Sequence, residues 1–568
     1  MAQIDMSLVR TWVQQCDQSR EHRCSRTSLT SRWPTDFKVT LIDVHRHCIT
    51  QVDPTRHRFR YLALSYVWGK ISQLELTKNN IATLADDESL TRLSDSLPQV
   101  IKDAMTVVYK LGERYLWVDS LCIVQDDSEV KHDLISRMAN IYDNAYLTIC
   151  AVDGVHANVG LPGVRPFTRV FDSIGETTRL RIARRPSRLS KVVFSSYYND
   201  RGWTFQERLL SRRCLYFTKE QVYFQCKSNI YCEDRYERRL PTDGWRGGHV
   251  HEDIRLLSPL RSPLRGDFPA YSRIVSEYTA KSLSFTSDKL NAITGVLYSL
   301  RLSNGWQFLY GIPVTLLGLS LIWVPTGQAR RHIEREPLNM FPSWSWIGWE
   351  GVVDYNIMLT GEEWTERPKM NTCIVLSAVE VLGAEVTYKE SIALAPDLAL
   401  PGPNSPLCHY PSGRTNVLHL WGPVAAATEF TFDMFFPNPT RLGKLPCNIA
   451  HPIVRVRDHH GRCCGAIYGV DSEDISTFRS RECGLVLISE TSHVQHLQFS
   501  ESGLSIPAYD AQHFHTRYSH NDGCSVYNVM LVAFEEELSH FCERLAVGQI
   551  HADAWSNRDA NYMYIHLV

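Results

Sequence analysis

The stretch Tyr61-Leu-Ala-Leu-Ser-Tyr-Val-Trp-Gly69 decides the fold class, because its first half has the composition of a buried strand. A short apolar run between polar segments is typical of a strand that is covered on both faces, as in a parallel sheet. Ser65, Tyr66, Trp68 and Gly69 follow where this strand ends. In open parallel α/β sheets, ligands bind outside the carboxyl ends of the strands. The stretch therefore predicts a parallel sheet with a candidate binding edge, although Tyr66 and Trp68 are also compatible with a core position.

The segments that follow repeat an alternation of helices and strands. Residues 96–112 have helical apolar spacing, a proline in the first turn and a closing glycine. Residues 115–119 form a second apolar strand, residues 128–145 a second helical pattern, and residues 146–151 a third strand. The order strand, helix, strand, helix, strand predicts a parallel α/β sheet with right-handed crossovers.

The length of the chain predicts more than one domain, because 568 residues exceed the size of a single ordinary core. We divide the chain into an N-terminal helix and strand preface (1–60), an α/β domain (61–226), a mixed loop and helical region packed on that domain (227–325) and a β-rich C-terminal region (326–568). The last region carries no recognisable activity. We expect it to brace or restrain the α/β domain.

Charge and hydropathy argue against several classes of function. Lys and Arg number 60 against 62 Asp and Glu, so the formal net charge is -2. This balance argues against a dedicated nucleic-acid binder, which carries a basic excess. The longest apolar run, residues 312–324, is interrupted by Pro313 and Gly318 and is too short to span a bilayer. Because residues 1–22 also show no signal-peptide pattern, we expect a cytoplasmic protein without a membrane span.

The cysteine pattern favours thiols over metal ligands. In the cytosol, the 16 cysteines are expected to be reduced. Cys16, His22 and Cys24 form one local cluster, and residues 459–464 form another. Neither cluster has the paired C-x-x-C spacing of a structural zinc site. We therefore expect buried or surface thiols and no metal.

The loop after the second strand, residues 119–127, carries the next candidate side chains. Asp119 lies at the end of an apolar strand, where loss of hydration would raise its pKa and suit it to proton transfer or to contacts with ribose hydroxyls. It is equally suited to accept a hydrogen bond from a loop amide. Cys122 could act as a nucleophile, but no histidine stands out as its base, so a buried thiol is favoured. Gln125 is a further candidate in this loop.

The loop after the third strand, residues 152–165, contains three glycines and Arg165, which together would suit a phosphate group. It matches neither the G-x-G-x-x-G nor the G-x-x-x-x-G-K-[ST] pattern. For this reason it is left out of the candidate site.

Residues 199–210 form a fourth element, a predicted helix whose cap is one of its first two residues, Asn and Asp. Trp203, Gln206 and Glu207 share one face of this helix. A carboxyl group between Trp and Leu side chains would be partly desolvated, and a shifted pKa would follow. The alternative, that Glu207 pairs with a nearby arginine, fits the sequence equally well.

Together, these segments resemble the heterokaryon incompatibility (HET) domain of filamentous fungi. YLALSYVWG is similar to its first motif, YLWVDSLCIVQDD followed by MANIYDNAYLTICA to its second, and RGWTFQERLLSRRCLYF to its third. Their order and spacing agree with that domain over residues 61–226. Later segments resemble the wider architecture of these proteins, namely SDKLNAITGVLYSL, LSLIWVP, PSWSWIGW and CERLAVGQIHADAWS.

The resemblance carries expectations about fold and function. It implies an α/β fold whose parallel-sheet HET domain is TIR-like with flavodoxin-like winding, followed by a helical segment and a β-rich C-terminal region. It also implies a cytoplasmic effector of non-self recognition, a form of innate immunity, whose activation causes programmed cell death or growth arrest of fused cells. Some TIR domains cleave NAD at the nicotinamide–ribose bond with a glutamate, whereas others act only as adaptors.

Two functions are therefore compatible with the sequence. The first is a death-signalling module whose motifs bind other incompatibility proteins or a second copy of the chain. The second is an NAD or nucleotide glycohydrolase, with NAD as substrate and no further cofactor. In that enzyme Glu207 or Asp119 contacts the ribose or its developing positive charge, while Tyr66, Trp68 and Trp203 stack on the bases. The predicted binding set is completed by Ser65, Gly69, Cys122, Gln125 and Gln206.

Overall fold

A computed structural model of the chain describes its backbone in segments that together cover most of the sequence. The described residues are 3–19, 24, 38–54, 59–127, 137–169, 173–177, 180–183, 186–227, 229–233, 268–326, 330–331, 341–355, 370–381, 384–386, 417–435, 453–470, 481–494, 524–535, 540–556 and 561–568. The chain divides into two units. Unit 1 comprises Met1–Ala270 and Lys281–Gly305, and unit 2 comprises Tyr271–Ala280 and Trp306–Val568.

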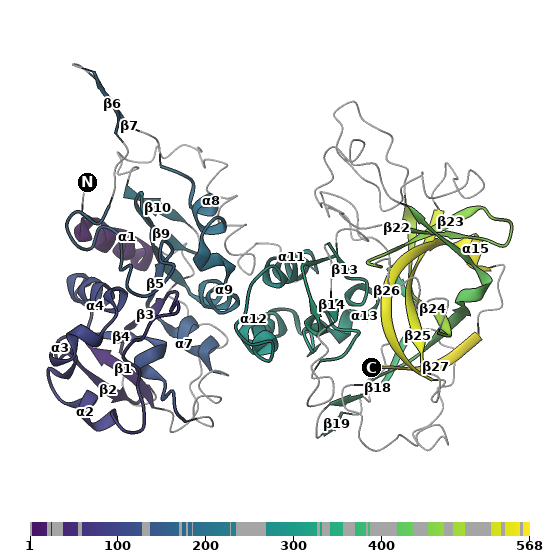
Figure 1. Ribbon diagram of the computed structural model, residues 1–568, viewed down its shortest axis with the longest axis horizontal. Coiled ribbons are helices and arrows are strands. Elements are labelled where there is room, and N and C mark those ends of the chain that lie inside the picture. Colours follow the sequence, from purple (N-terminus) through teal and green to yellow (C-terminus); the bar gives the residue numbers. More distant parts are fainter. Residues whose placement is uncertain are drawn as a thin grey trace. The chain divides into compact units, whose positions relative to one another are not determined.

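Unit 1 contains an eight-stranded sheet in the order β10-β9-β8-β5-β3-β4-β1-β2 (Figure 1). Its neighbouring strands β8, β5, β3 and β4 are parallel. Across the sheet these strands lie in the order β4, β3, β5, β8. Since β3 comes first along the chain and β4 second, this order is 2-1-3-4, as at the start of a flavodoxin-like sheet. The strands are β1 (Val39–Asp43), β2 (Cys48–Val52), β3 (Tyr61–Ser65), β4 (Tyr115–Trp117), β5 (Leu147–Ala151), β8 (Arg213–Phe217), β9 (Val222–Cys226) and β10 (Ile230–Cys232).

The predicted parallel sheet is thus confirmed for the central strands, and the flanking strands make the sheet a mixed one. β1 pairs with β4, and β9 with β8, in antiparallel register. Every residue of β3 and β5 is buried, which explains why these strands are apolar without alternation.

Helices cover both faces of this sheet, with α1 and α4 on one side and α7 and α9 on the other (Figure 1). The sequence explains why α4 forms, because its apolar residues recur at helical spacing and face inward. Gly112 ends the helix with a φ of 79°. The main helices of unit 1 are α1 (Met6–Gln18), α2 (Ile81–Ala85), α3 (Ser89–Arg92), α4 (Gln99–Leu111), α5 (Asp119–Cys122), α7 (Met138–Asn144), α8 (Leu189–Phe194), α9 (Gly202–Leu210) and α12 (Asp288–Asn304).

Two of the predicted helical patterns differ from the structure in extent. The pattern at residues 128–145 is seen only as α7, because residues 128–136 lie outside the described part of the chain. The helical part of the region predicted at residues 227–325 is divided between α11 (Phe268–Thr279) and α12. The connection between them returns to α9, where Ser282 O accepts a hydrogen bond of 3.0 Å from the N–H of Gly202.

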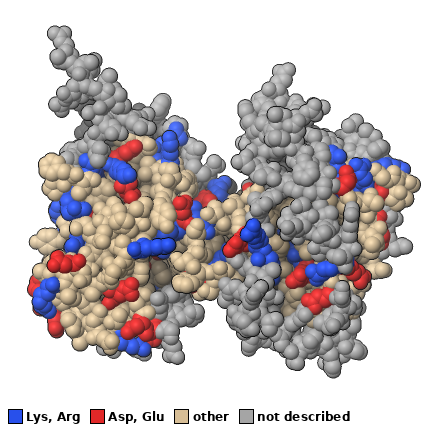
Figure 2. Space-filling model, viewed as in Figure 1, with Lys and Arg blue, Asp and Glu red and all other residues tan. Residues whose placement is uncertain are grey.

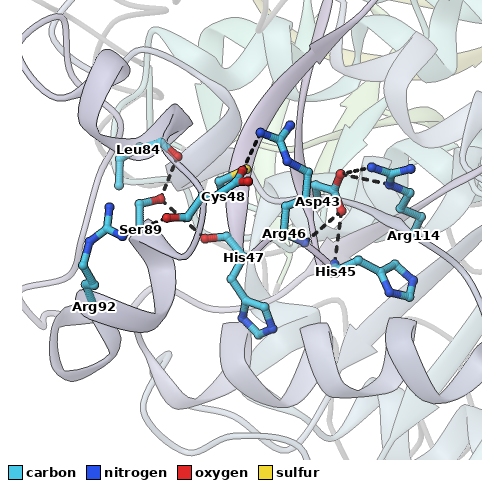
Figure 3. A network of polar contacts seen from close by, with 10 residues as sticks. Asp43, His45, Arg46, His47, Cys48, Leu84, Ser89, Arg92 and Arg114 are labelled. Atoms are coloured by element: carbon cyan, nitrogen blue, oxygen red, sulfur yellow. Dashed lines mark hydrogen bonds and ion pairs between the residues drawn. The ribbon is translucent and has the colours of Figure 1, made fainter.

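The turn between β1 and β2 is tied to the start of β4 by a buried carboxylate (Figure 3). Asp43 is 1% exposed, and its Oδ2 accepts hydrogen bonds of 2.9 and 2.7 Å from the Arg114 guanidinium. Its Oδ1 accepts from the backbone N–H groups of His45 and Arg46 at 3.1 and 3.3 Å. These bonds hold the pKa of Asp43 below its ordinary value against the opposing effect of burial, as expected for a buried charge that is fully paired.

Unit 2 is rich in β-structure, as predicted for the C-terminal region. Its large sheet has the order β19-β18-β20-β24-β25-β26-β23-β22-β21, and β27 pairs with both β20 and β26. The pairing therefore runs from β20 through β24, β25, β26 and β27 back to β20. The strands are β17 (Met370–Thr372), β18 (Val375–Val381), β19 (Ala384–Val386), β20 (Leu418–Ala426), β21 (Thr431–Phe435), β22 (Ile453–Arg457), β23 (Cys463–Tyr468), β24 (Cys483–Val494), β25 (Cys524–Phe534), β26 (Phe541–His551) and β27 (Asn561–Leu567).

Surface charge agrees with the balanced composition. On the face shown in Figure 2, acidic and basic side chains of the described residues are interspersed. Within the described part of the chain, no helix combines the length and the apolarity that a bilayer crossing requires.

Candidate functional site

The carboxyl ends of β3 and β4 bring together side chains from the three motif segments. Ser65 is the last residue of β3, and Asp119 follows β4 after a single intervening residue. Helix α9, which carries Glu207, packs against β3. Because β3 and β4 are parallel, their carboxyl ends lie at the same edge of the sheet, and segments 54 and 142 residues apart meet there.

Glu207 is the most enclosed acid of this site. The residue is 5% exposed, and its Oε2 accepts a hydrogen bond from the Ser65 hydroxyl. Ser65 Oγ also lies 2.6 Å from the hydroxyl of Tyr198, and both residues are fully buried. The three side chains form a continuous buried chain of polar groups, so displacing any one of them would leave the others unsatisfied.

The environment of Glu207 favours its neutral form. Burial raises the pKa of this carboxyl to about 8, and the negative charge of Asp119 acts in the same direction. The hydrogen bond from Ser65 and the positive charge of Arg201 lower the pKa but do not cancel the effect of burial. At neutral pH the carboxyl is therefore mostly protonated and carries one O–H donor.

Asp119 occupies the more open half of the site. Its Oδ2 accepts a hydrogen bond of 2.8 Å from Trp68 Nε1, and its Oδ1 accepts from the N–H of Ser120 at 2.8 Å. Burial raises its pKa above the ordinary value, while the bonds from Trp68 and Ser120 and the charge of Arg201 lower it. Of the two roles that the sequence left open, Asp119 is seen in the contact with a loop amide, while its role toward a ribose or a proton stays a prediction.

The aromatic residues of the first motif differ in exposure. Tyr66 is buried, and its hydroxyl donates to Ser120 Oγ at 3.2 Å. Trp68 and Trp203 keep part of their surface exposed, and Gly69 is exposed with a φ of 70°. Tyr66 is thus a core residue, whereas the two tryptophans retain surface that a ligand or a partner could contact.

Three predicted residues are engaged elsewhere. Gln206 is buried and turns to α12, where its Oε1 accepts a 2.8 Å hydrogen bond from the N–H of Gly295. Gln125 donates from Nε2 to the main-chain oxygen of Asp119 at 3.0 Å and so shapes the loop. Cys122 is a buried thiol whose pKa burial raises to about 12, so it is not a nucleophile at neutral pH.

The glycine-containing loop at residues 152–165 is organised around an internal ion pair. Arg165 contacts the buried Asp103 of α4, with Nε 3.0 Å from its Oδ1. The N–H of Leu161 donates to the other carboxylate oxygen at 2.8 Å. The positive charge that would have suited a phosphate group is therefore paired with Asp103.

The predicted cap of α9 is wrong. Asn199 and Asp200 belong to a preceding 3₁₀ turn (Tyr197–Asp200), and the residue at the N-cap position is Arg201, without a side-chain cap. The reason is tertiary: the N–H of Ser282 donates to Asp200 O at 2.6 Å and the N–H of Gly202 donates to Ser282 O at 3.0 Å. This pairing with Ser282 holds Arg201 in an extended conformation, so the helix begins after it.

Sequence reasoning missed Tyr142, Tyr198 and Arg201 as members of the site. Tyr142 appeared as one apolar position of a helix, yet its hydroxyl donates to Leu64 O at 3.0 Å and its hydrogen bonding lowers the pKa of Glu207. Tyr198 and Arg201 lie close to Glu207 along the chain, but the spacing carries no sign that they face the carboxyl groups. The position of Arg201 within the third quoted motif was a signal for that residue, whereas Tyr198 precedes the motif.

The fold and the site define an α/β domain with a mixed sheet and two desolvated carboxyl groups at the carboxyl ends of its central parallel strands. The family model described as "Heterokaryon incompatibility protein (HET)" matches residues 61–207 and ends at the glutamate of this site. The chain is therefore a HET-domain protein.

One relative gives the same indication. "Heterokaryon incompatibility protein 6, OR allele" of Neurospora crassa is 27% identical over 151 residues, which are 24% of this chain and 21% of that protein. The matched segment thus spans about a fifth of the relative's length. No solved structure matches the chain.

Proposed function

We propose that this chain acts in heterokaryon incompatibility, as an effector whose HET domain triggers growth arrest or death of fused cells. The observation that supports this proposal most directly is the meeting of all three motif segments at one polar cluster. Ser65 comes from the first, Asp119 from the second and Glu207 from the third. A cluster assembled from every matched motif is the part of the domain on which a shared function would depend.

Within this proposal, the buried chain from Tyr198 through Ser65 to Glu207 fixes α9 on β3. The partly exposed Trp68 is held in turn by its bond to Asp119. The domain thereby presents a rigid aromatic surface beside Gly69, suited to another incompatibility protein or to a second copy of the chain. Aromatic side chains anchored by a polar bond are common at the centres of protein interfaces.

Inducible expression in a filamentous fungus that lacks the gene tests the effector function. Wild-type protein is expected to arrest growth after induction, and Asp119→Asn is expected to weaken the arrest because Trp68 loses part of its anchor. Glu113→Gln is the matched control. It alters a carboxyl group that precedes β4, at the opposite edge of the sheet, and that pairs with Arg60 at 2.9 Å.

Colony growth and vital-dye uptake measure the outcome, with protein levels compared by immunoblot. Arrest by wild type and Glu113→Gln but not by Asp119→Asn, at equal protein levels, supports both the function and the site. Growth that continues with abundant wild-type protein contradicts the effector function. Full toxicity of Asp119→Asn contradicts the role of this residue only.

A second candidate function, cleavage of NAD or a related nucleotide, is supported by the pair of carboxyl groups. The reaction breaks the bond between the ribose carbon and the nicotinamide nitrogen and adds water to the ribose, so positive charge develops on the sugar. A neutral Glu207 cannot stabilise that charge but can donate a hydrogen bond. Asp119, the more open acid, is then the group that faces the ribose, and Arg201 offsets part of the mutual repulsion of the acids.

Purified full-length protein incubated with NAD provides the test. Nicotinamide release is expected to fall on the order of 100-fold in Asp119→Asn, since an anion facing the developing charge would be lost. The enzyme function is supported if wild type and Glu113→Gln both release nicotinamide and Asp119→Asn does not. If no nicotinamide is released while the wild-type protein still arrests growth in cells, the chain signals without this chemistry.

A further inference from the structure

Three cysteines that are distant in sequence meet inside unit 1. Cys16 lies in the last turn of α1, Cys24 follows that helix, and Cys226 ends β9. Their sulfur atoms all lie within 4.8 Å of one another, and all three residues are fully buried. α1 packs against β9, which accounts for the approach (Figure 1). Local spacing grouped Cys16 with His22, which lies outside the described residues, and with Cys24, so Cys226 could not be found from sequence.

Each sulfur of this cluster receives its own N–H donor. Arg213 Nε lies 3.2 Å from Cys16 Sγ. The N–H of Lys227 donates to Cys24 Sγ at 3.3 Å, and the N–H of Asn229 donates to Cys226 Sγ at 3.3 Å. A protonated thiol is a weak acceptor, whereas a thiolate is a strong one. Each of the three sulfurs is therefore oriented by a donor that a thiolate bound to a metal ion could also use.

Three thiolates packed this closely in a dry interior would need a cation among them. Sulfur ligands select soft metal ions such as Zn²⁺ and Cu⁺. Sulfurs bound to one Zn²⁺ at about 2.3 Å lie about 3.8 Å apart, so small side-chain movements would bring all three sulfurs to ligand distance. The N–H donors would then serve as the outer hydrogen bonds that orient metal ligands.

We propose that Cys16, Cys24 and Cys226 form a binding site for one thiophilic metal ion, Zn²⁺ or Cu⁺. The ion would clamp the end of α1 and the residue Cys24 to the end of β9. This site is separate from the cluster around Glu207 and does not depend on the proposed function. Among the described residues, these three cysteines supply the ligand atoms.

Metal analysis of the full-length protein tests the site. Protein purified with a reductant and without chelators is expected to carry about one Zn²⁺ or Cu⁺ per chain by plasma mass spectrometry, which also tells the two ions apart. Cys226→Ser is expected to lose the ion. Cys232→Ser is the matched control, because Cys232 is a buried cysteine of the neighbouring strand β10 outside the cluster.

A second measurement keeps the proposal testable if Cys226→Ser folds poorly. Metal-free wild-type protein titrated with Co²⁺ is expected to develop a sulfur-to-metal charge-transfer band that Zn²⁺ or Cu⁺ abolishes. The site is supported if Cys232→Ser retains the metal ion and Cys226→Ser loses it. It is also supported if the charge-transfer band appears with Co²⁺. Wild-type protein without metal and without the band, or a disulfide between two of the three cysteines in the reduced preparation, overturns it.

Discussion

Glu207→Gln is expected to gain stability relative to the wild type as the pH rises. Between about pH 4.5 and about pH 9, the difference in the free energy of unfolding between the two proteins should shift by roughly 5 kcal/mol in favour of the variant. The folded carboxyl has a pKa of about 8 against an ordinary value of 4.5, because burial disfavours the charge. Between these values the folded state holds a proton that the unfolded state has released. The free energy of unfolding of the wild type therefore falls as the pH rises from about 4.5 to about 8, and then levels off.

Glutamine stays neutral throughout, so Glu207→Gln lacks this decline. Denaturant unfolding of both full-length proteins between pH 4.5 and 9 measures the effect. Subtracting the two free energies of unfolding at each pH cancels the contributions of the titratable groups that both proteins share. Glu113→Gln is the control, since its half-buried carboxyl is paired with Arg60 and should change the pH dependence less. Parallel curves for wild type and Glu207→Gln would show that Glu207 is ionised in the fold.

Gly69→Ala is expected to destabilise the domain by about 2 to 5 kcal/mol. The φ of 70° at Gly69 costs an L-residue about 1–2 kcal/mol. An added Cβ would also overlap the side chain of His156 and lie 2.9 Å from its Cα. His156 cannot withdraw easily, because the next residue, Ala157, donates its N–H to Trp68 O at 3.1 Å. Overpacking of this kind adds about 1–3 kcal/mol.

Gly112→Ala isolates the backbone part of this effect. Gly112 has a similar φ of 79°, but nothing lies within 4 Å of its added Cβ. Its replacement should cost only about 1–2 kcal/mol. Thermal and denaturant unfolding of the two variants give the comparison. Equal losses at both positions would mean that the loop carrying His156 adapts and that the close approach at Gly69 has no energetic weight.

The strands and helices of unit 1 could be predicted where local pattern and tertiary packing agree. The apolar run of β3 and the apolar stripe of α4 are buried as their periodicity requires. The site was predictable only as a set of segments, since the edge rule for parallel sheets locates Ser65 and Asp119 without giving their partners.

Partners depend on distances that the sequence does not contain. Glu207 and Gln206 are neighbours on one helix, yet one bonds to Ser65 and the other to Gly295. The cap of α9 failed as a prediction for the same reason, because pairing with Ser282, 80 residues beyond Gly202, holds Arg201 extended and sets where the helix begins. Cys226 joins Cys16 and Cys24 through the packing of α1 on β9 and not through any motif.

The path of the chain between the two units has a practical result for dissecting this protein. The chain passes from unit 1 to unit 2 after Ala270, returns at Lys281 and leaves again after Gly305. A single cut after Gly305 would therefore release all of unit 1, but the fragment would carry Tyr271–Ala280 of unit 2 with it. A fragment that stops at residue 207 or 226 would lack α12, leaving Gln206 without the N–H of Gly295. An excised domain that retains its native α9 must therefore extend to Gly305, well beyond the residues that carry the three motifs.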